Sequence, residues 1–239
     1  KDKNPDIRIT SIRLARQLRD EVELARFPEA LKLTDPSPAV RREMLVGLRG
    51  LTLEDSAAVP EVWASLALQH DGEDRWYLEA LGLAADGRWD LFLVSWLNRV
   101  GPDWKSKAGR DIVWRSRAEI TPGLLARLIR DPETPEEELP RLMRAFDFQT
   151  STQTQDALMK LAFAEDGGEN AAFYQAEALN RLEGFDINSN PDYRKALDQV
   201  LEASEGTSQF VKLVEKFSVA DRYDDLLALA QRHSQEQLG

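Results

Sequence analysis

The N-terminal half of the sequence repeats itself at a spacing of 33 residues. Pro5–Arg8 (Pro-Asp-Ile-Arg) returns as Pro38–Arg41 (Pro-Ala-Val-Arg), and residues 42–48 match residues 75–81 at the same spacing. A further match, at 141–146, lies two periods beyond 75–81. Repeats of this length are typical of stacked helical units, each too small to bury its own apolar face without a neighbour. We therefore expect a series of helix pairs that cover one another.

Residues 70–90 predict one such helix pair. His70-Asp71-Gly72 ends a preceding helix, and Asp74 offers a carboxylate to the free backbone N–H groups of the next one. Tyr77, Leu78, Leu81, Leu83 and Ala84 recur at helical spacing, mostly on one face, and Asp86-Gly87 ends that helix before another begins at Arg88. Further helices are expected to begin near Pro5 and Pro38, and to cover residues 24–33, 59–69, 88–99, 106–116, 121–130, 135–146, 152–164, 169–183, 191–204, 207–217 and 221–234.

The fold class expected from these patterns is all-α. Alternating Val, Ile and Thr runs are absent, whereas Leu and Ala are abundant. The Asp-Pro-x-x-x-Val-Arg sequence at 35–41 resembles HEAT repeats, and the signatures of ankyrin and tetratricopeptide repeats are missing. The resemblance implies an α-α superhelix, that is, a HEAT/armadillo-like solenoid of helix hairpins. Short connections favour one domain over residues 1–239, with the Gly167-Gly168 turn as its weakest point.

The composition excludes several classes of partner and site. A formal net charge of −11 repels nucleic acid, and no stretch approaches the ~20 apolar residues of a membrane span. Without Cys, the chain has no disulfides, no thiolate metal site and no covalently attached haem. Residues 1–50 hold 11 Lys and Arg against 8 Asp and Glu. This basic segment is either a solvated helix face or a surface that docks on an acidic neighbouring domain.

The six Trp residues all fall in the middle of the chain. Two interpretations stay open: the rings fill gaps between helices, or they stack on sugars or on a partner's loop. The residues are Trp63, Trp76, Trp89, Trp96, Trp104 and Trp114.

One segment has the alternating oxygen side chains of a calcium-binding loop, namely Asp186, Asn188, Asn190 and Asp192. It departs from the calcium pattern twice. Pro191 stands where a tight loop needs Gly, and Leu197 stands where a bidentate Glu is needed. Asn190-Pro191 is also a typical helix start, and this interpretation is favoured over a metal site.

No pattern of catalytic residues is present. His70 and His233 have no second His at metal-ligand spacing, and Glu136–Glu138 fits the first turn of a helix, where the dipole favours negative charge. The sequence has no Gly-x-Ser-x-Gly elbow, no phosphate-binding glycine loop and no Cys nucleophile. We therefore expect a non-catalytic chain with no cofactor of its own.

Residues 71–82, 111–117 and 144–148 resemble the helical-repeat region of the large haem-binding, membrane-bound dehydrogenase-like proteins of planctomycetes. Such proteins join a sugar-dehydrogenase-like β-propeller, a HEAT-like solenoid and a cytochrome c domain, and are exported to the periplasm. The resemblance implies a scaffold or protein-interaction module of an exported redox protein, whose partners are neighbouring domains or other proteins. Because Cys-x-x-Cys-His is absent here, any haem would belong to other domains. The start at Lys1 predicts a segment excised from a larger protein.

Four residues of these motifs are candidates for interaction: Arg75, Trp76, Trp114 and Arg117. They either pin the repeats together through Arg–carboxylate or Arg–aromatic contacts, or face a neighbouring domain. Two alternative functions stay open. One is a carbohydrate-binding module that uses the Trp cluster, and the other is an enzyme of the HEAT-like DNA glycosylase type, which the acidic charge disfavours.

Overall fold

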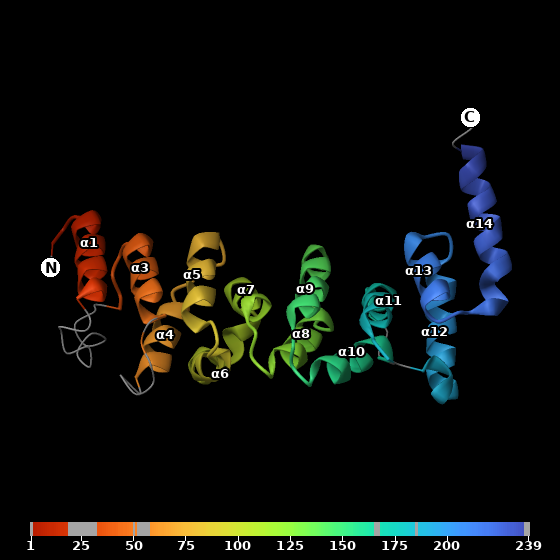
Figure 1. The fold of residues 1–239 in the computed structure, drawn as a ribbon, viewed down its shortest axis with the longest axis horizontal. Helices are drawn as coiled ribbons and strands as arrows, with labels where there is room; N and C mark the ends of the chain where they lie inside the picture. The colour runs from red at the N-terminus through yellow and green to blue at the C-terminus, as the bar shows by residue number, and fades with distance from the viewer. Residues whose placement is uncertain are drawn as a thin grey trace. The chain divides into compact units, whose positions relative to one another are not determined.

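The computed structural model describes residues 2–18, 33–49, 51, 58–164, 168–184 and 186–236, with side chains up to residue 232. All regular structure in these residues is helical: thirteen α-helices and five short 3₁₀ helices (Figure 1). The expected all-α class is confirmed. The chain divides into two compact units, residues 1–121 and residues 122–239, and each is described by itself. The expectation of a single domain over 1–239 stays a prediction.

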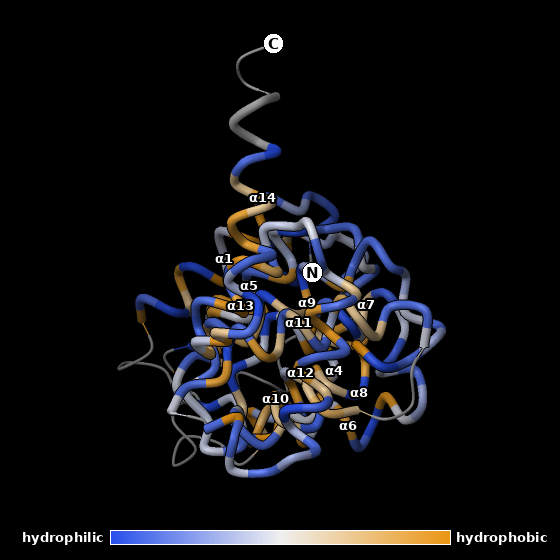
Figure 2. The backbone as a smooth tube through the Cα atoms, turned by 90° about the vertical axis from the view of Figure 1, so that its right-hand side faces the viewer, coloured by the Kyte–Doolittle hydropathy of each residue, from blue (hydrophilic) through white to orange (hydrophobic). Residues whose placement is uncertain are grey.

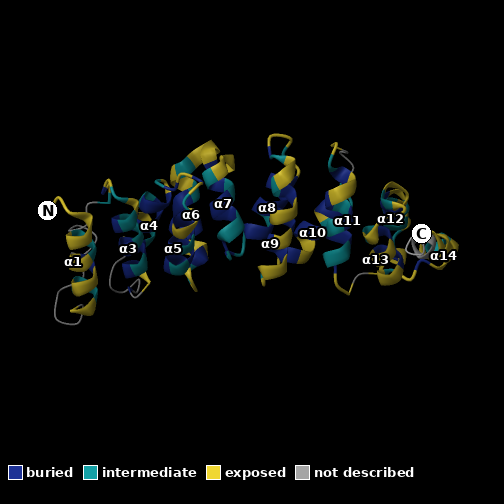
Figure 3. Ribbon diagram, turned by 90° about the horizontal axis from the view of Figure 1, so that it is seen from above, coloured by how far each residue is buried: buried dark blue, intermediate teal, exposed yellow. Residues whose placement is uncertain are grey.

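In the first unit, helices that alternate along the chain pack side by side. α1 packs on α3, α3 on α5, and α5 on α7, while α4 packs on α6 (Figure 1). Each helix thereby has buried positions toward its neighbours and exposed positions on the opposite side (Figure 3). The bounds are α1 (Pro5–Gln17), α3 (Pro38–Leu48), α4 (Val59–Ala67), α5 (Arg75–Ala85), α6 (Trp89–Val100), the 3₁₀ helix η2 (Gly101–Lys105) and α7 (Lys107–Arg115).

Aromatic side chains join these helices in the core of the first unit. Trp63 is fully buried, and its indole Nε1 donates a hydrogen bond of 3.0 Å to the Leu81 carbonyl. The same ring meets Trp89 edge-on at 5.8 Å and stacks on Phe92 at 5.5 Å, between ring centroids. Trp63 on α4 therefore contacts both α5 and α6, and large rings of this kind contribute strongly to core stability.

The helix starts follow the expected signals, and the repeat spacing is only partly regular. Asn4 and Asp74 accept hydrogen bonds from the backbone N–H groups of the first turns of α1 and α5. The N-cap residues of α1 and α3, Asn4 and Ser37, lie 33 residues apart, as the sequence predicts. The matching segments 42–48 and 75–81 begin at different helix positions, because residue 42 lies inside α3 whereas Arg75 is the first residue of α5. Connections of different length break the register.

In the second unit, α11 packs against α9, α10, α12 and α13. The buried side chains include Leu142, Leu158, Leu179 and Phe210, one from each of α9, α10, α11 and α13. The bounds are α8 (Thr121–Ile129), η3 (Glu136–Glu138), α9 (Leu139–Ala145), η4 (Phe146–Phe148), α10 (Thr154–Ala162), α11 (Ala171–Arg181), η5 (Ile187–Ser189), α12 (Pro191–Ser204), α13 (Ser208–Lys216), η6 (Ala220–Arg222) and α14 (Tyr223–Glu236).

One expected helix is wrong in its extent. Residues 135–146 were expected to form a single α-helix, but Glu136–Glu138 is a 3₁₀ helix and the α-helix begins at Leu139. Pro140 explains the difference, because it has no N–H group and its ring clashes with the carbonyl of the residue four positions earlier in an α-helix. The other expected helices from 59 onward agree with the structure within two residues at each end. The expected helix 24–33 lies outside the described residues, apart from residue 33.

Hydropathy colouring shows apolar and polar residues interspersed along the helices (Figure 2). In the part of the chain that the structure describes, no helix is long and apolar enough to span a bilayer.

Candidate functional site

A groove of about 460 Å³ lies over α3, α5 and α7 in the first unit. Its lining includes Trp76, one of the four interaction candidates. The full lining is Arg42 and Val46 from α3, Trp76, Glu79, Ala80 and Leu83 from α5, and Arg115 from α7. We call this hollow the Trp76 groove.

The groove has an apolar floor because α5 is apolar on two faces. Tyr77, Leu78 and Leu81 are buried in the core. Trp76, Ala80 and Leu83 are spaced four and three residues apart, so they share a second face of the same helix. The Trp76 side chain is 71% exposed, although its indole is among the largest apolar groups of the chain. The exposed indole thus lies beside the apolar side chains of Val46, Ala80 and Leu83.

Two arginine side chains stand at the edges of the groove. Arg115 donates from Nε to Glu79 Oε2 at 3.1 Å, and Arg42 Nη1 lies 3.6 Å from Asp74 Oδ1, which is too long for a hydrogen bond. Among the described residues, neither guanidinium makes another hydrogen bond. Both side chains are partly exposed, 33% for Arg42 and 25% for Arg115. Each therefore keeps hydrogen-bond donors for a ligand.

Gly82 makes room for one of these arginines. A Cβ atom at Gly82 would lie 2.5 Å from Arg115 Cζ, so the guanidinium lies directly on the backbone of α5. Together with Glu79, Gly82 sets the position of the Arg115 guanidinium. A side chain with a fixed position loses less conformational entropy on binding than a free one.

The other three interaction candidates lie nearby but do different things. Arg75, the first residue of α5, is exposed and has no ion-pair partner among the described residues. Trp114 is half-buried. Arg117 Nη1 donates to the carbonyls of Ser116, Trp114 and Arg115, at 2.6, 3.2 and 3.2 Å. Burial, together with the charge of Arg115, lowers the pKa of Arg117. Arg117, which follows α7, thus caps the C-terminal end of that helix.

The Trp residues belong mainly to the core. Trp63, Trp89, Trp96 and Trp104 are buried, and Trp114 is half-buried. Trp76 is exposed. A stacking platform of several rings is therefore not formed, and a single indole is available to a ligand.

His70 has a partner that sequence reasoning missed. Its Nε2 lies 3.2 Å from Asp111 Oδ2 of α7, and its ring stacks on Tyr77 at 6.0 Å between centroids. Only 1% of the His70 side chain is exposed. The contact joins the turn after α4 to α7 and is closed to solvent. No local pattern indicates it, because the two residues are 41 positions apart.

The acidic residues next to His70 serve the backbone instead. Asp71 Oδ1 accepts hydrogen bonds from the N–H groups of Asp74 and Glu73, at 3.0 and 2.8 Å. These bonds stabilise the carboxylate and lower the pKa of Asp71. Asp71 thereby shapes the turn that leads into α5.

The proposed calcium-loop residues start two successive helices. Asp186 Oδ1 accepts from the N–H of Asn188 at 2.9 Å, and Asn190 Oδ1 accepts from the N–H of Asp192 at 2.9 Å. The expected helix start at Asn190-Pro191 is confirmed. In the described residues, no three His, Cys, Asp or Glu side chains gather as a metal site would require. His233 lies outside the described side chains.

A second hollow, of about 590 Å³, lies in the second unit and differs in character. Its Arg181 donates from Nε to Asp147 at 2.8 Å and from Nη1 to Glu177 at 2.5 Å. Burial opposes the charge, but these hydrogen bonds outweigh it and raise the pKa of Arg181. Lys216 Nζ donates to the Asn180 carbonyl at 2.6 Å, and burial lowers the pKa of this lysine. Unlike the arginines of the Trp76 groove, these two cations already have short hydrogen bonds.

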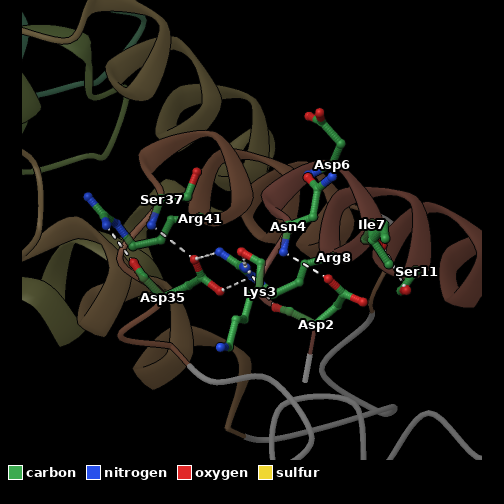
Figure 4. A network of polar contacts seen from close by, with 10 residues as sticks. All are labelled: Asp2, Lys3, Asn4, Asp6, Ile7, Arg8, Ser11, Asp35, Ser37 and Arg41. Atoms are coloured by element: carbon green, nitrogen blue, oxygen red, sulfur yellow. Dashed lines mark hydrogen bonds and ion pairs between the residues drawn. The ribbon is translucent and has the colours of Figure 1, made fainter.

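The repeated arginines Arg8 and Arg41 converge on Asp35 (Figure 4). Arg8 donates from Nε and Nη2 to the two carboxylate oxygens at 2.8 and 2.9 Å, and Arg41 Nη1 donates to the Asp35 carbonyl at 2.6 Å. The Ser37 N–H donates to the same carboxylate at 2.9 Å. Burial alone would raise the pKa of Asp35, but these bonds and the two arginine charges lower it. The network ties α1 to the start of α3.

A scan against protein-family models, a search of curated proteins and a search of solved structures each returned no match to this chain. The function is therefore argued from the Trp76 groove itself.

Proposed function

We propose that this chain is a HEAT-like α-solenoid that acts as a non-catalytic protein-interaction module and binds its partner at the Trp76 groove. The observation that carries the proposal is the exposed Trp76 indole on an apolar floor between Arg42 and Arg115. Trp and Arg are the residues most enriched at the energetic centres of protein interfaces. Leaving such a ring in water forgoes burial energy that a partner recovers.

The helices around the groove support its use as a preformed surface. Ion pairs link successive helices of the row: Arg13 on α1 with Glu43 on α3, at 2.9 Å, and Arg115 on α7 with Glu79 on α5. Lys107, the first residue of α7, pairs with Glu73 in the turn before α5. These pairs add to the packing of the helices and hold the groove in one arrangement. A surface that is already ordered costs less to bind than one that must fold first.

The wider context is part of the same proposal: the module connects and docks domains of an exported multidomain redox protein. Its support is the motif resemblance, and the position of the groove adds to it. Residues 71–82 contain Trp76, Glu79 and Ala80, and residues 111–117 contain Arg115. The two motifs thus supply four of the seven residues that line the groove, although they are more than 25 positions apart in the sequence.

Site-specific photo-crosslinking in the producing cell tests the interaction function. A benzophenone amino acid replaces Trp76 in one protein and Leu91, an exposed residue of α6, in a matched control. We expect a discrete adduct from position 76, to another domain of the same protein or to another protein, and a much weaker one from position 91. Equal adducts from both positions, or no adduct from position 76, would contradict the proposal.

A further inference from the structure

We propose that the Trp76 groove binds a peptide segment in which an apolar side chain is flanked by carboxylates. The inference rests on the proposed function and names the chemistry of the partner.

The cations of the groove fit carboxylates. Arg115 uses Nε for Glu79, so both of its Nη groups remain as donors, and Arg42 makes no hydrogen bond within the described residues. Arg75 precedes Trp76 in the chain and has no ion-pair partner among the described residues, but it does not line the groove. Two parallel N–H groups of a guanidinium match the two oxygens of a carboxylate, and such charge-assisted bonds are the strong ones. The edges of the groove thus offer sites for acidic side chains.

The floor of the groove fits an apolar side chain between those acidic ones. Val46, Ala80 and Leu83 present hydrocarbon, and the Trp76 indole stands beside them. Burying a Leu-sized side chain here removes apolar area from water on both partners, which is worth roughly 25 cal/mol per Å² before the costs of association. The arrangement favours a partner in which apolar and acidic side chains alternate.

The distribution of charge favours an acidic peptide over nucleic acid. Asp74 and Glu79 remain beside the arginines, so the groove can accept a few carboxylates but not the continuous negative charge of a phosphate backbone. Residues 122–239 hold 12 Lys and Arg against 22 Asp and Glu, which repels a polyanion at longer range. Residues 1–121 hold 19 against 20, so the unit that carries the groove is nearly neutral. A short acidic segment is therefore only weakly repelled by this unit.

Fluorescence anisotropy with designed probes tests the inference on the full 239-residue chain. The probe is a short fluorescein-labelled peptide in which Leu alternates with Glu, and its matched copies carry Gln or Lys in place of every Glu. We expect the Glu peptide to bind at least about tenfold more tightly than the Gln copy, since hydrogen bonds between two charged groups are stronger than those to a neutral amide. The Lys copy should not bind, and added salt should weaken the Glu peptide.

Variants locate the binding and separate it from folding. Trp76→Ala, in an exposed position, should lower the affinity for the Glu peptide about tenfold or more without changing the unfolding midpoint. Arg42→Gln with Arg115→Gln should remove the preference for Glu over Gln, with the folded state checked by circular dichroism. Arg99→Gln on α6, an arginine paired with Glu61, is the matched control and should bind as the unchanged chain does.

Four outcomes overturn the inference: equal binding of the Glu and Gln peptides, binding that persists in Trp76→Ala, tighter binding of a single-stranded oligonucleotide, or tighter binding of an oligosaccharide. The two proposals fail separately. If position 76 crosslinks to a protein but the Glu peptide shows no preference, the interaction function stands and the acidic-peptide inference fails. If the Glu peptide binds but position 76 yields no adduct in the cell, the interaction function fails instead.

Discussion

The guanidinium of Arg115 lies on the backbone of Gly82, where a Cβ atom would come within 2.5 Å of Cζ. This close approach joins α7 to α5 and places one of the two arginines of the Trp76 groove. A second glycine, Gly109, is just as close to another segment, because its Cβ would lie 2.1 Å from the Trp104 carbonyl oxygen. The neighbour of Gly82 is a side chain and that of Gly109 is backbone, and this difference determines how much stability an Ala substitution at each position removes.

Gly82→Ala and Gly109→Ala should therefore differ in stability. At Gly82 the neighbour is the far end of a side chain, so Arg115 can leave its position on α5 by rotating away, and the helix preference of Ala over Gly, about 1 kcal/mol, offsets the lost contact with Glu79. At Gly109 the neighbour is backbone that cannot move without shifting η2, so we expect a loss of about 1–3 kcal/mol or more. Urea unfolding of both variants measures the free energies of unfolding. An equal loss in the two variants would contradict the argument.

Buried and exposed Trp residues should respond oppositely to replacement by Phe. Trp63→Phe removes the hydrogen bond to the Leu81 carbonyl and leaves a small cavity, so we expect a loss of about 1–3 kcal/mol. Trp76→Phe should change stability by no more than about 0.5 kcal/mol. Acrylamide quenching gives an independent readout, because Trp76→Phe should remove the most accessible part of the fluorescence while Trp63→Phe should not.

The contact between His70 and Asp111 should contribute to folding. His70→Ala removes a buried ring together with its hydrogen bond to Asp111 and its stacking on Tyr77, and we expect a loss of about 2–4 kcal/mol. Asp111→Asn keeps a side-chain oxygen that can accept a hydrogen bond from the imidazole, so it should lower the stability less than His70→Ala does. Thermal unfolding followed by circular dichroism compares the two variants. A His70→Ala protein as stable as the unchanged chain would show that the contact is dispensable.

Acid should weaken the tie between α1 and α3. The pKa of Asp35 is lowered in the folded chain, so between the folded and unfolded pKa values the unfolded state binds more protons. The stabilisation by the Asp35 carboxylate is therefore complete above its usual pKa of about 3.9 and is lost as the pH falls through the lower folded value. Asp35→Asn should be less stable than the unchanged chain at neutral pH.

Denaturant unfolding at neutral pH and at several values below about 4 measures this difference. The difference in free energy of unfolding between the two proteins should narrow with falling pH, because protonation makes the Asp35 side chain of the unchanged protein neutral as well. Asp71, whose pKa is also lowered, is present in both proteins and gives each the same remaining acid dependence. A difference in free energy of unfolding that stays constant over the whole pH range would contradict the stabilising role of the Asp35 carboxylate.

Local signals in the sequence were sufficient for the helices. Asn4, Asp74 and Asn190 each accept hydrogen bonds from the helix start that the sequence predicts, and apolar spacing gave the lengths of most helices. These features depend on residues within a few positions of one another, and for that reason pattern reasoning recovers them. Pro140 shows how such reasoning fails when one residue inside a pattern is overlooked. Trp76 was selected from its motif, but nothing in the motif indicated that its ring is exposed while Trp63 is buried.

What the sequence determined by itself is the all-α class and most helix boundaries. Tertiary structure alone decided that Arg8 and Arg41 meet at Asp35, that His70 meets Asp111, and that Trp76 lies in a groove between Arg42 and Arg115. The physical reason is the range of the interactions. Caps and helical periodicity act over one or two turns, whereas the contacts of Arg8 with Asp35 and of His70 with Asp111 join residues 27 and 41 positions apart and form only when the segments that carry them pack together.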